Sequence, residues 1–397
     1  MNLLYTITAY TPSTGGSQHL MHQLARTLIT HHSLQVLTQW TTNRTDWLLG
    51  TTLKAPSENT DYQVDRVPVH QIGLSIREKI ALVPWVAAYF PLQDLAIHGI
   101  SRILENHITP YAAQADLIHN CRIGREGLSY ASLNAARKFS IPFVLTPVHH
   151  PRWGGWFHRY YHQLYRQADA VIALTETERQ ILITLGVSEK NIFVTGMGPV
   201  LAEYGSENEF RQKYKFCDDP LVLFLGQKYA YKGLESILRA APLVWKRFPK
   251  TRFVFIGPRT GYSQKLFAGM TDPRILELGT VTLQEKTDAL AACSLLCVPS
   301  SQESFGGVYT EAWMLERPVI GCAIPSVSEV IADGQDGLLT DQSPESVAAK
   351  IIALLTDPQR ATSMGQAGKQ KVLNHFTWEQ LARKTEQIYH TLTKTNG

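Results

Sequence analysis

Several features that would place the chain in a familiar class are missing from the sequence. Cysteine is scarce: the 397 residues contain five, an odd number, with no Cys-x-x-Cys pair and no His-rich segment at zinc-site spacing. This pattern argues against a disulfide framework and against a zinc finger. We expect all five cysteines to be buried, reduced thiols: Cys121, Cys217, Cys293, Cys297 and Cys322.

Long apolar runs are also missing. No stretch of about 18 apolar residues occurs, so we expect no membrane-spanning helix. The first residues, MNLLYTITAYTPSTGG, lack a basic region followed by a long apolar core, and they predict a first β-strand rather than a secretion signal. The expected location is the cytoplasm. The formal net charge is only +4 and the basic residues are spread along the chain, so no nucleic acid partner is expected.

The catalytic motifs of several common enzyme classes are absent. The first predicted strand is not followed by Gly-x-Gly-x-x-Gly, and the chain has no Gly-x-x-x-x-Gly-Lys-[Ser/Thr], His-Glu-x-x-His or Gly-x-Ser-x-Gly. A dehydrogenase, a P-loop enzyme, a zinc protease and an α/β hydrolase are therefore disfavoured. Asp-x-Asp is missing too, so a metal-bridged diphosphate site has no obvious ligands. We expect no metal and no other cofactor.

The composition that remains is that of a folded, two-domain protein. Apolar residues make up 44% and charged residues 18%, and the chain is longer than one hydrophobic core usually supports. Apolar runs of strand length alternate with helical segments, which predicts an α/β fold with parallel sheets. The glycine-rich break at 196–199 suggests a linker. We predict domains at 1–198 and 199–375, followed by a closing helix within 376–397.

The alternation predicts individual elements in both halves. In the first half we predict strands at 3–9, 34–38, 117–119, 143–146 and 170–174, and helices at 18–29, 128–138 and 156–166. In the second half we predict strands at 221–225, 253–256, 295–298, 319–320 and 337–339, and helices at 233–248, 306–315, 344–355, 358–374 and 378–391.

One segment of the first half, residues 80–100, is nearly uncharged and carries Trp85, Tyr89 and Phe90 between two prolines. Two interpretations stay open. We favour a helix that is buried on several sides and broken by Pro84 and Pro91. The alternative is a surface that contacts lipid or an apolar acceptor, which would place the protein peripherally at a membrane.

The segment from Pro299 to Ala312, PSSQESFGGVYTEA, is the most informative for function. It joins a predicted buried strand to a helix, so it lies at the carboxyl edge of a parallel sheet, where open α/β proteins bind ligands. Gly306 and Gly307 would let a diphosphate approach the free amides and the positive end of the helix dipole. Glu303 and Glu311 would suit sugar hydroxyls. From residue chemistry alone, a capping Glu and an ordinary surface Glu explain the pair equally well.

A second informative segment is LVLFLGQKYAYKG, at 221–233, in which a strand ends at Gly226 before a loop that carries Lys228 and Lys232. A lysine at the opening of a helix suits phosphate neutralisation. Considered singly, either lysine is more often a solvated surface residue.

Taken together, these segments resemble family 4 retaining glycosyltransferases of the GT-B fold, over essentially the whole chain. The family motif Pro-Ser-x-x-Glu-Ser-Phe-Gly-x-x-x-x-Glu-Ala, with a Pro-Val-Ile strand and a Gly-x-x-Gly-Leu-Leu turn, is matched by 299–312, 318–320 and 334–339. The resemblance implies two Rossmann-like domains facing each other across a cleft, with a C-terminal helix that crosses back to the first domain.

The resemblance also implies roles for single residues in the second half. Glu303 would meet the hydroxyls of the donor sugar, and Glu311 would hold the ribose. The amides of Gly306 and Gly307 would meet the diphosphate, and the adjacent Ser304 and Phe305 are expected to take part in donor binding. Val281, in Gly279-Thr280-Val281, lies in the segment whose backbone would read the nucleobase. Lys232 matches the family's diphosphate lysine. The family's arginine position is Gln227 here, so Lys228 is expected to replace that cation.

In the first half the resemblance rests on fewer residues. Gly16, in the pair Gly15-Gly16 after the first strand, matches the family's glycine loop, and His149, with His150 in reserve, stands where the family has a histidine near the donor sugar. Without the family context, a histidine pair after a strand is more often structural. The expected catalytic residues are His149, Glu303 and Lys232; the expected donor-binding residues are Gly16, Lys228, Lys232, Val281, Glu303, Ser304, Phe305, Gly306, Gly307 and Glu311.

The resemblance implies transfer of a hexose-type sugar from a nucleoside diphosphate sugar to a hydroxyl of a glycan, a glycolipid or a small molecule, with retention of anomeric configuration. The sequence offers no evident carboxylate nucleophile, so the same-face route, in which the leaving phosphate accepts the acceptor's proton, is the expected one. Two alternatives stay open. A nucleoside diphosphate sugar 2-epimerase would share the fold, and a donor-binding protein that has lost turnover is suggested by Gln227.

Overall fold

The computed structural model describes residues 1–42, 47–121, 124–150 and 153–394. These residues form two compact units. The first comprises Met1–Gly196 and the chain from Trp378 onwards, and the second comprises Met197–Thr377. The closing helix is therefore part of the first unit.

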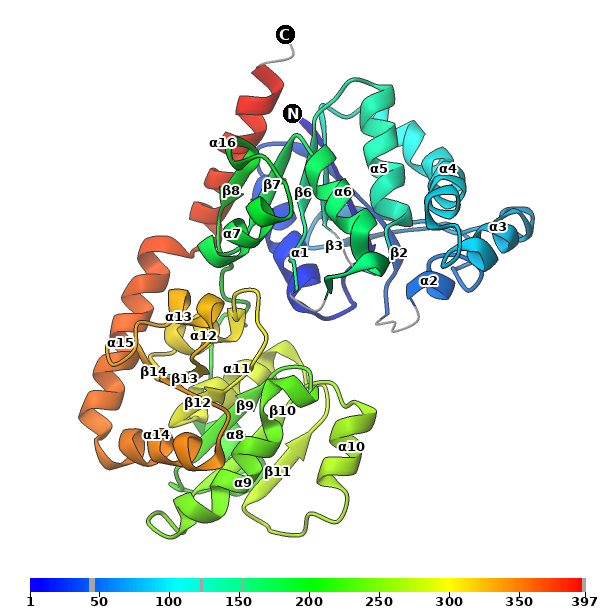
Figure 1. Cartoon of the computed structure of the whole chain (residues 1–397). Coiled ribbons are helices and arrows are strands. Elements are labelled where there is room, and N and C mark those ends of the chain that lie inside the picture. Colours follow the sequence, from blue (N-terminus) through cyan, green and yellow to red (C-terminus); the bar gives the residue numbers. More distant parts are fainter. Residues whose placement is uncertain (43–46, 122–123, 151–152, 395–397) are drawn as a thin grey trace. The chain divides into compact units, whose positions relative to one another are not determined.

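The first unit is built on a sheet whose strand order is β3-β4-β2-β1-β5-β6-β7-β8 (Figure 1). All neighbouring strands run parallel except β3 and β4, which form an antiparallel hairpin at one edge. The strands are β1 (Asn2–Ala9), β2 (Ser33–Trp40), β3 (Thr60–Val64), β4 (Val67–Gln71), β5 (Leu117–Cys121), β6 (Phe143–Thr146), β7 (Ala170–Ala173) and β8 (Ile192–Val194).

Helices cover both faces of this sheet, which is why strands such as β1 and β5 are buried along almost their whole length. They are α1 (Gly16–Leu28), α2 (Trp47–Gly50), α3 (Ile76–Ala88), α4 (Gln93–Ala112), α5 (Gly127–Lys138), α6 (Arg159–Gln167), α7 (Glu176–Thr184) and α16 (Trp378–Lys394), with short 3₁₀ turns at Trp156–His158 and Glu189–Asn191. Helix α16 packs against α1.

A buried polar cluster fixes α16 to the first sheet. The Tyr389 hydroxyl of α16 lies 2.8 Å from the Tyr5 hydroxyl of β1 and is hydrogen-bonded to Nδ1 of His119 in β5. Nε2 of His119 lies 2.8 Å from the Thr146 hydroxyl. Burial lowers the pKa of His119 to about 3, so this imidazole stays neutral at ordinary pH.

The second unit contains a fully parallel sheet in the order β11-β10-β9-β12-β13-β14. Its strands are β9 (Leu221–Leu225), β10 (Arg252–Ile256), β11 (Ile275–Leu278), β12 (Leu295–Val298), β13 (Val319–Cys322) and β14 (Gly337–Thr340). The chain first winds from β9 outwards to β11 and then from β12 outwards to β14. The strand order therefore reverses between β9 and β12, which makes their carboxyl ends the switch point at which such sheets bind ligands.

The helices of the second unit are α8 (Glu207–Tyr214), α9 (Leu234–Trp245), α10 (Gly261–Phe267), α11 (Leu283–Ala292), α12 (Gly307–Met314), α13 (Pro325–Val330), α14 (Pro344–Thr356) and α15 (Pro358–His375), with a 3₁₀ turn at Ala230–Lys232. None of the helices in the described part of the chain combines the length and the apolar character needed to span a bilayer.

The interpretation that we favoured for residues 80–100 is correct in part: the helix breaks at Pro91, between α3 and α4, and the beginning of α4 is buried. Helix α3 contradicts the rest of it. It begins with a capping box between Ser75 and Glu78, continues through Pro84 without a break, and has only Leu82 fully buried. Ile76 is 73% exposed and Ile80 is 65% exposed. Pro84 fails to end the helix because it lies in an exposed part of a helix that packs on α4 by its other face.

The predicted burial of all five cysteines is wrong for one of them. Cys121, Cys293, Cys297 and Cys322 are buried, but Cys217 is exposed in the loop that precedes β9, with a positive φ of 46°. In this turn between α8 and β9 the preceding residue, Phe216, takes the buried position, with its ring 6.2 Å from that of Phe210.

Candidate functional site

The loop between β12 and α12 exposes backbone amides at the switch point of the second sheet. Gly306 precedes α12 with φ of +87°, and a Cβ atom on it would lie 2.3 Å from the ring of Tyr309. The Tyr309 hydroxyl donates to the carbonyl of Val298 at 2.8 Å, so the ring cannot move aside. Only glycine fits at position 306, and the first amides of α12 remain open to an anion.

The loop after β9 packs directly on the loop after β12. Gly233 has φ of +81°, and its missing Cβ would lie 2.6 Å from the carbonyl oxygen of Pro299. The backbone N–H of Ser301 donates to the carbonyl of Tyr231 at 2.9 Å. The side chain of Gln342 donates to the carbonyls of both Tyr231, at 3.0 Å, and Pro299, at 2.6 Å. We did not identify Gln342 from the sequence, because no motif marks it.

This packing brings together two residues that the sequence separates by 71 positions. The Lys232 ammonium donates a hydrogen bond to Oε1 of Glu303, and both side chains are largely shielded from solvent. The backbone carbonyl of Glu303 accepts from the Ser326 hydroxyl of α13 at 2.7 Å. Glu303 is thus positioned by its backbone, and its carboxylate and the lysine neutralise each other in this structure.

Neighbouring residues of the motif are less accessible. Phe305 is buried, and its ring lies edge-on to that of Phe376 at 5.2 Å between centroids. Ser304 lies beside it at the surface of the loop and is half-buried. Of these two residues, only Ser304 is exposed enough to contact a ligand with its side chain.

Glu311 lies on the second turn of α12 and is 7% exposed. Its Oε1 accepts a hydrogen bond from the Lys286 ammonium of α11 at 2.8 Å. Its Oε2 is buried and has no hydrogen-bond partner among the described residues. A buried carboxylate oxygen without a donor is costly, so this atom fits the hydroxyl of a ligand. Lys286 was missed from the sequence, although it lies on the helix that follows Val281.

Val281 lies in the loop between β11 and α11 and is half-buried. The Thr282 side chain caps α11 by accepting from the amide of Glu285 at 3.1 Å. The capped helix holds Lys286 against Glu311, so α11 connects the loop at 279–281 to this carboxylate.

Lys228 does not occupy the position that we expected for a second diphosphate cation. Its side chain is 0% exposed, and its ammonium is hydrogen-bonded to the Glu277 carboxylate and to the carbonyl of Leu278, both in β11. The lysine reaches across β10 because its backbone N–H is tied to the carbonyl of Pro258, at 3.2 Å, just beyond that strand. A buried, paired ammonium is unavailable to an anion at the β9–β12 switch point.

In the first unit, His149 follows β6 and is 5% exposed. Its backbone N–H donates to Oε1 of Glu178 in α7 at 2.5 Å, and its ring lies edge-on to Trp153 and Tyr165. Oε2 of Glu178 accepts from the N–H of Leu174 at 2.8 Å. Burial raises the pKa of Glu178 to about 7. We did not single out Glu178 from the sequence.

Gly16 begins α1 directly after β1 and the loop that follows it. His150, our reserve, is half-buried with its ring 5.7 Å from that of Trp153. The predicted roles of Gly16 and His149 stay predictions. Within the described residues, no group of three or more His, Cys, Asp or Glu side chains lies together as a metal site would require; metal independence likewise stays a prediction.

Two family models match the chain. Residues 206–371 match the model described as "Glycosyl transferases group 1", and residues 15–198 match the "Glycosyl transferase 4-like domain". Between them they account for most of both units.

Individual relatives match only part of the chain. The chain is 30% identical over 250 residues to a D-inositol 3-phosphate glycosyltransferase of Kribbella flavida, and 28% identical over 252 residues to the protein of that name from Xylanimonas cellulosilytica. The matched regions cover 59% and 58% of this chain, and 59% of each relative. The chain therefore spans about three fifths of the length of these relatives.

Solved structures match the fold over the whole chain. Anabaena HepE, solved in complex with UDP and glucose, has a TM-score of 0.74 at 17% identity and covers 99% of this chain and 100% of its own. Sucrose-phosphate synthase from Thermosynechococcus elongatus has a TM-score of 0.74 at 18% identity, with 100% of both chains covered. These matches confirm the predicted fold class of two Rossmann-like α/β units.

Proposed function

We propose, from the premise that the chain belongs to the group 1 glycosyl transferases, that it transfers a hexose-type sugar from a nucleoside diphosphate sugar to an acceptor hydroxyl with retention of configuration. The observation that carries the proposal is the contact of Lys232 with Glu303 at the switch point, beside the open amides of α12. Cation, carboxylate and amides meet there, as a sugar diphosphate requires.

Donor binding would exchange partners within this group. The diphosphate would take the Lys232 ammonium and the amides at Gly306 and Gly307, and the sugar hydroxyls would take the Glu303 carboxylate. As the anomeric bond breaks, negative charge grows on the leaving diphosphate, and a cation and amides that are already in place stabilise it without reorganisation. Oε2 of Glu311 would accept from a ribose hydroxyl.

Retention is proposed from the resemblance to retaining glycosyltransferases, and the surroundings of Glu303 support a same-face route over a double displacement. Glu303 is engaged by Lys232 in this structure and would be engaged by sugar hydroxyls when the donor binds, so it would not be free to attack the anomeric carbon. The proposed route is attack by the acceptor on the face that the diphosphate leaves, with a phosphate oxygen accepting the proton. His149, fixed by Glu178, and Gly16 are proposed to serve the sugar and the acceptor from the first unit.

The acceptor is proposed to be a glycan, a glycolipid or a small molecule, and helix α3 supports the lipid alternative. Ile76, Ile80 and Val83 lie on one exposed face of α3 and continue into exposed Phe90, Leu92 and Leu95; we call these six residues the α3 face. Trp156 and Phe157 are also exposed, and Phe157 contacts Phe90 with 6.1 Å between ring centroids. Arg77 on α3, and Arg159 stacked 3.8 Å from Trp156, add positive charge. Such a surface suits peripheral contact with an anionic membrane.

Two measurements test the proposal. A thermal-shift screen with UDP, GDP and ADP sugars should show a higher melting temperature for one nucleotide series, because a ligand that binds only the folded state stabilises it. With the best donor, Glu303→Gln should keep the fold but lower transfer severely, since charge-assisted hydrogen bonds of roughly 1.5 to 3 kcal/mol each are lost.

Glu345→Gln is the matched control, because Glu345 is exposed on α14. Activity of Glu303→Gln within about threefold of that control would remove Glu303 from the site. Product analysis without an added acceptor separates transfer from epimerisation: an epimerised donor would overturn the proposal, and donor binding without any transfer or hydrolysis would leave a binding protein.

A further inference from the structure

The buried Lys228 belongs to a series of ion pairs that has no role in the proposed reaction. Its ammonium contacts Oε1 of Glu277, and Oε2 of the same carboxylate accepts from Nε of Arg259 at 2.8 Å. The Thr260 hydroxyl donates to the Lys228 carbonyl at 2.7 Å. Lys228, Arg259 and Glu277 thus link the carboxyl ends of β9, β10 and β11 in that order.

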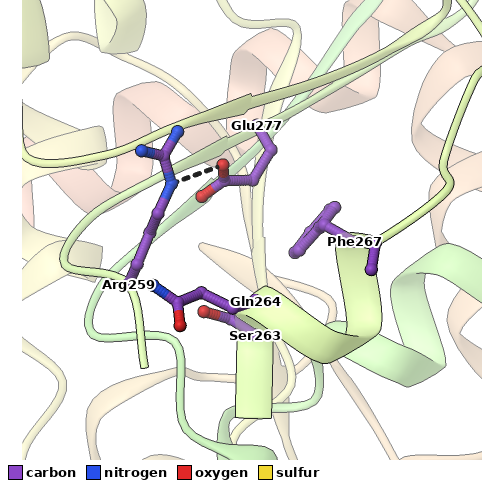
Figure 2. A pocket seen from close by; sticks show the side chains of 6 residues that line it. Arg259, Ser263, Gln264, Phe267 and Glu277 are labelled. Atoms are coloured by element: carbon purple, nitrogen blue, oxygen red, sulfur yellow. Dashed lines mark hydrogen bonds and ion pairs between the residues drawn. The ribbon is translucent and has the colours of Figure 1, made fainter. Parts of the chain in front are cut away.

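The last member of this series of ion pairs, Arg259, lies at the surface. The Arg259 side chain is half exposed, whereas Glu277 is 16% exposed and Lys228 is fully covered. Nη1 of Arg259 lies 3.6 Å from where a Cβ atom on Gly279 would be, so the guanidinium runs along the first residue after β11. Figure 2 shows the guanidinium beside the Glu277 carboxylate at the edge of a pocket lined by α10.

The pocket is too small for a whole nucleotide sugar. It holds about 240 Å³ and is lined by Arg259, Ser263, Gln264, Phe267, Ala268 and Glu277. Sites for complete small-molecule ligands generally measure about 300 to 1,000 Å³. One planar ring with its substituents is a suitable occupant for such a volume, with Phe267 as an apolar wall and Arg259 as a polar one.

The position along the sheet indicates which part of the donor reaches this pocket. Glu303 and Lys232 flank the switch point between β9 and β12, and Glu311 is joined to α11 through Lys286. The loop at 279–281, which precedes α11, is therefore next along the edge, and Arg259 lies against it. A donor whose sugar lies at Glu303 and whose ribose lies at Glu311 has its base at this end.

We propose that Arg259 is the side chain that binds the nucleobase of the donor, with its planar guanidinium against the base, and that Lys228 and Glu277 position it. The inference rests on the proposed nucleoside diphosphate sugar donor. A guanidinium stacks on aromatic rings and keeps N–H donors free for ring carbonyls or nitrogens, which an ammonium cannot do. Nε of Arg259 is taken by Glu277, so the plane of the group is fixed before the base arrives.

The buried lysine is explained by this role. Ion pairs buried from water contribute little net stability, and breaking one leaves an uncompensated charge. Burial lowers the pKa of Lys228 while the adjacent Glu277 carboxylate favours the charged ammonium. The Lys228 ammonium is held by the Leu278 carbonyl and donates to Oε1 of Glu277. Lys228 therefore fixes the Glu277 carboxylate, so that Oε2 is held in one position for Arg259.

The test separates base from diphosphate by comparing two kinds of ligand on the full chain. Dissociation constants are measured calorimetrically for UDP, GDP and ADP, and for inorganic pyrophosphate, which has no base. Arg259→Ala should weaken the best nucleoside diphosphate by at least about tenfold, or 1.4 kcal/mol, and leave pyrophosphate within about twofold. Arg259→Lys keeps the charge but not the plane, and should resemble Arg259→Ala.

Two further variants complete the comparison. Lys228→Met should repeat the pattern of Arg259→Ala, whereas Lys232→Ala should weaken nucleotide and pyrophosphate alike. Lys265→Ala, which removes an exposed charge from α10, should change neither. If Lys228→Met does not fold, the Arg259 variants decide the question, because that side chain is half exposed.

Three results would overturn the inference. Unchanged nucleotide affinity in Arg259→Ala would show that Arg259 does not contact the nucleobase. Equal losses for pyrophosphate and nucleotide in Arg259→Ala would assign it to the diphosphate instead. Loss of pyrophosphate affinity in Lys228→Met, to the extent seen in Lys232→Ala, would restore Lys228 as a diphosphate cation. A wild-type protein that binds neither kind of ligand would instead contradict the proposed function itself.

Discussion

Lys232 is the side chain on which the proposed chemistry depends most. Lys228 is committed to Glu277, which leaves Lys232 as the lysine at the switch point that can meet the leaving diphosphate. Lys232→Ala should therefore lower the transfer rate at least about a hundredfold, on the order of 3 kcal/mol in the barrier. The loss should appear in kcat more than in donor affinity, because the charge grows in the transition state.

Steady-state kinetics of Lys232→Ala, Lys228→Ala and Gln227→Arg with one donor check this assignment. Lys228→Ala should affect KM for the donor more than kcat. A kcat for Lys228→Ala as low as that of Lys232→Ala would show that both lysines act on the diphosphate, and a faster Gln227→Arg would show that the site lacks a second cation.

Glu178 makes the stability of the first unit dependent on pH. Its pKa is raised to about 7 in the fold from an ordinary value of 4.5, so the folded state holds the proton more tightly than the unfolded state. The stabilising contribution is fully present below about pH 4.5 and is lost as the pH rises through about 7. A shift of this size corresponds to on the order of 3 kcal/mol.

Unfolding midpoints measured from pH 5 to pH 8 for the wild type and Glu178→Gln check this dependence. The midpoint of the wild type should fall with pH more steeply than that of Glu178→Gln, which cannot ionise. The variant should also be less stable at pH 5, because its amide can accept from only one of the two N–H groups, of His149 and Leu174, that the carboxyl group serves. Parallel pH profiles for the two proteins would contradict the role of Glu178.

The parallel strands were predictable from the sequence because covered strands read as continuous apolar runs. Phe143–Thr146, Leu221–Leu225 and Leu295–Val298 were predicted with the observed bounds. The hairpin of β3 and β4 was missed for two reasons. Strand β3 is largely exposed and polar, and β4, although mostly buried, is a short segment in which Pro68, His70 and Gln71 interrupt any apolar run. Strand β11 was missed for a similar reason: all four of its residues are only half-buried, and one is Glu277.

The site was predictable where backbone geometry demands particular residues. Positions 306 and 233 must be glycine because a Cβ atom at either position would collide with a neighbour, and these glycines were recognisable in the sequence. Gln342, Lys286 and Glu178 belong to no recognisable sequence motif, because their roles come from side-chain contacts with partners that are distant in the chain. The burial of Lys228 could not be predicted for the same reason, because its partner, Glu277, lies in β11, a strand that the sequence analysis missed.

Helix α16 should depend on its buried tyrosine. Tyr389→Phe removes the hydroxyl that joins Tyr5 and His119, and leaves polar atoms of both without that partner. We expect the first unit to lose about 1 to 3 kcal/mol of stability. Denaturant unfolding monitored for both proteins measures the loss, with Lys384→Ala on the exposed side of α16 as the control. Equal midpoints for the tyrosine variant and the control would show that α16 is held by apolar packing alone.

The α3 face should bind membranes if it serves a lipid acceptor. We expect the protein to sediment with vesicles that contain phosphatidylglycerol, and Ile80→Asp combined with Val83→Asp to reduce the bound fraction at least about tenfold, because burial of two apolar side chains is lost. Met270→Asp, at an exposed apolar residue of the second unit, is the control. Equal binding of the double variant and the control would show that the α3 face does not touch lipid.

For the molecule as a whole, the absence of Asp-x-Asp and the use of Lys232 predict a reaction that needs no metal. Excess EDTA should leave the initial rate nearly unchanged, because the proposed site would neutralise the diphosphate with an ammonium and with helix amides. A loss of most activity that magnesium or manganese restores would contradict this prediction and would require carboxylates outside the arrangement described for the second unit.

The contact of Lys232 with Glu303 has a consequence for turnover. Under the proposed function, an intact donor would replace both partners of this ion pair, with its phosphate at the lysine and its sugar at the carboxylate. The spent nucleoside diphosphate can replace only one: it must separate the pair and leave a shielded carboxylate uncompensated, or bind without the lysine. Re-formation of the ion pair therefore competes with the leaving product but not with the substrate, so product inhibition should be weak compared with donor binding.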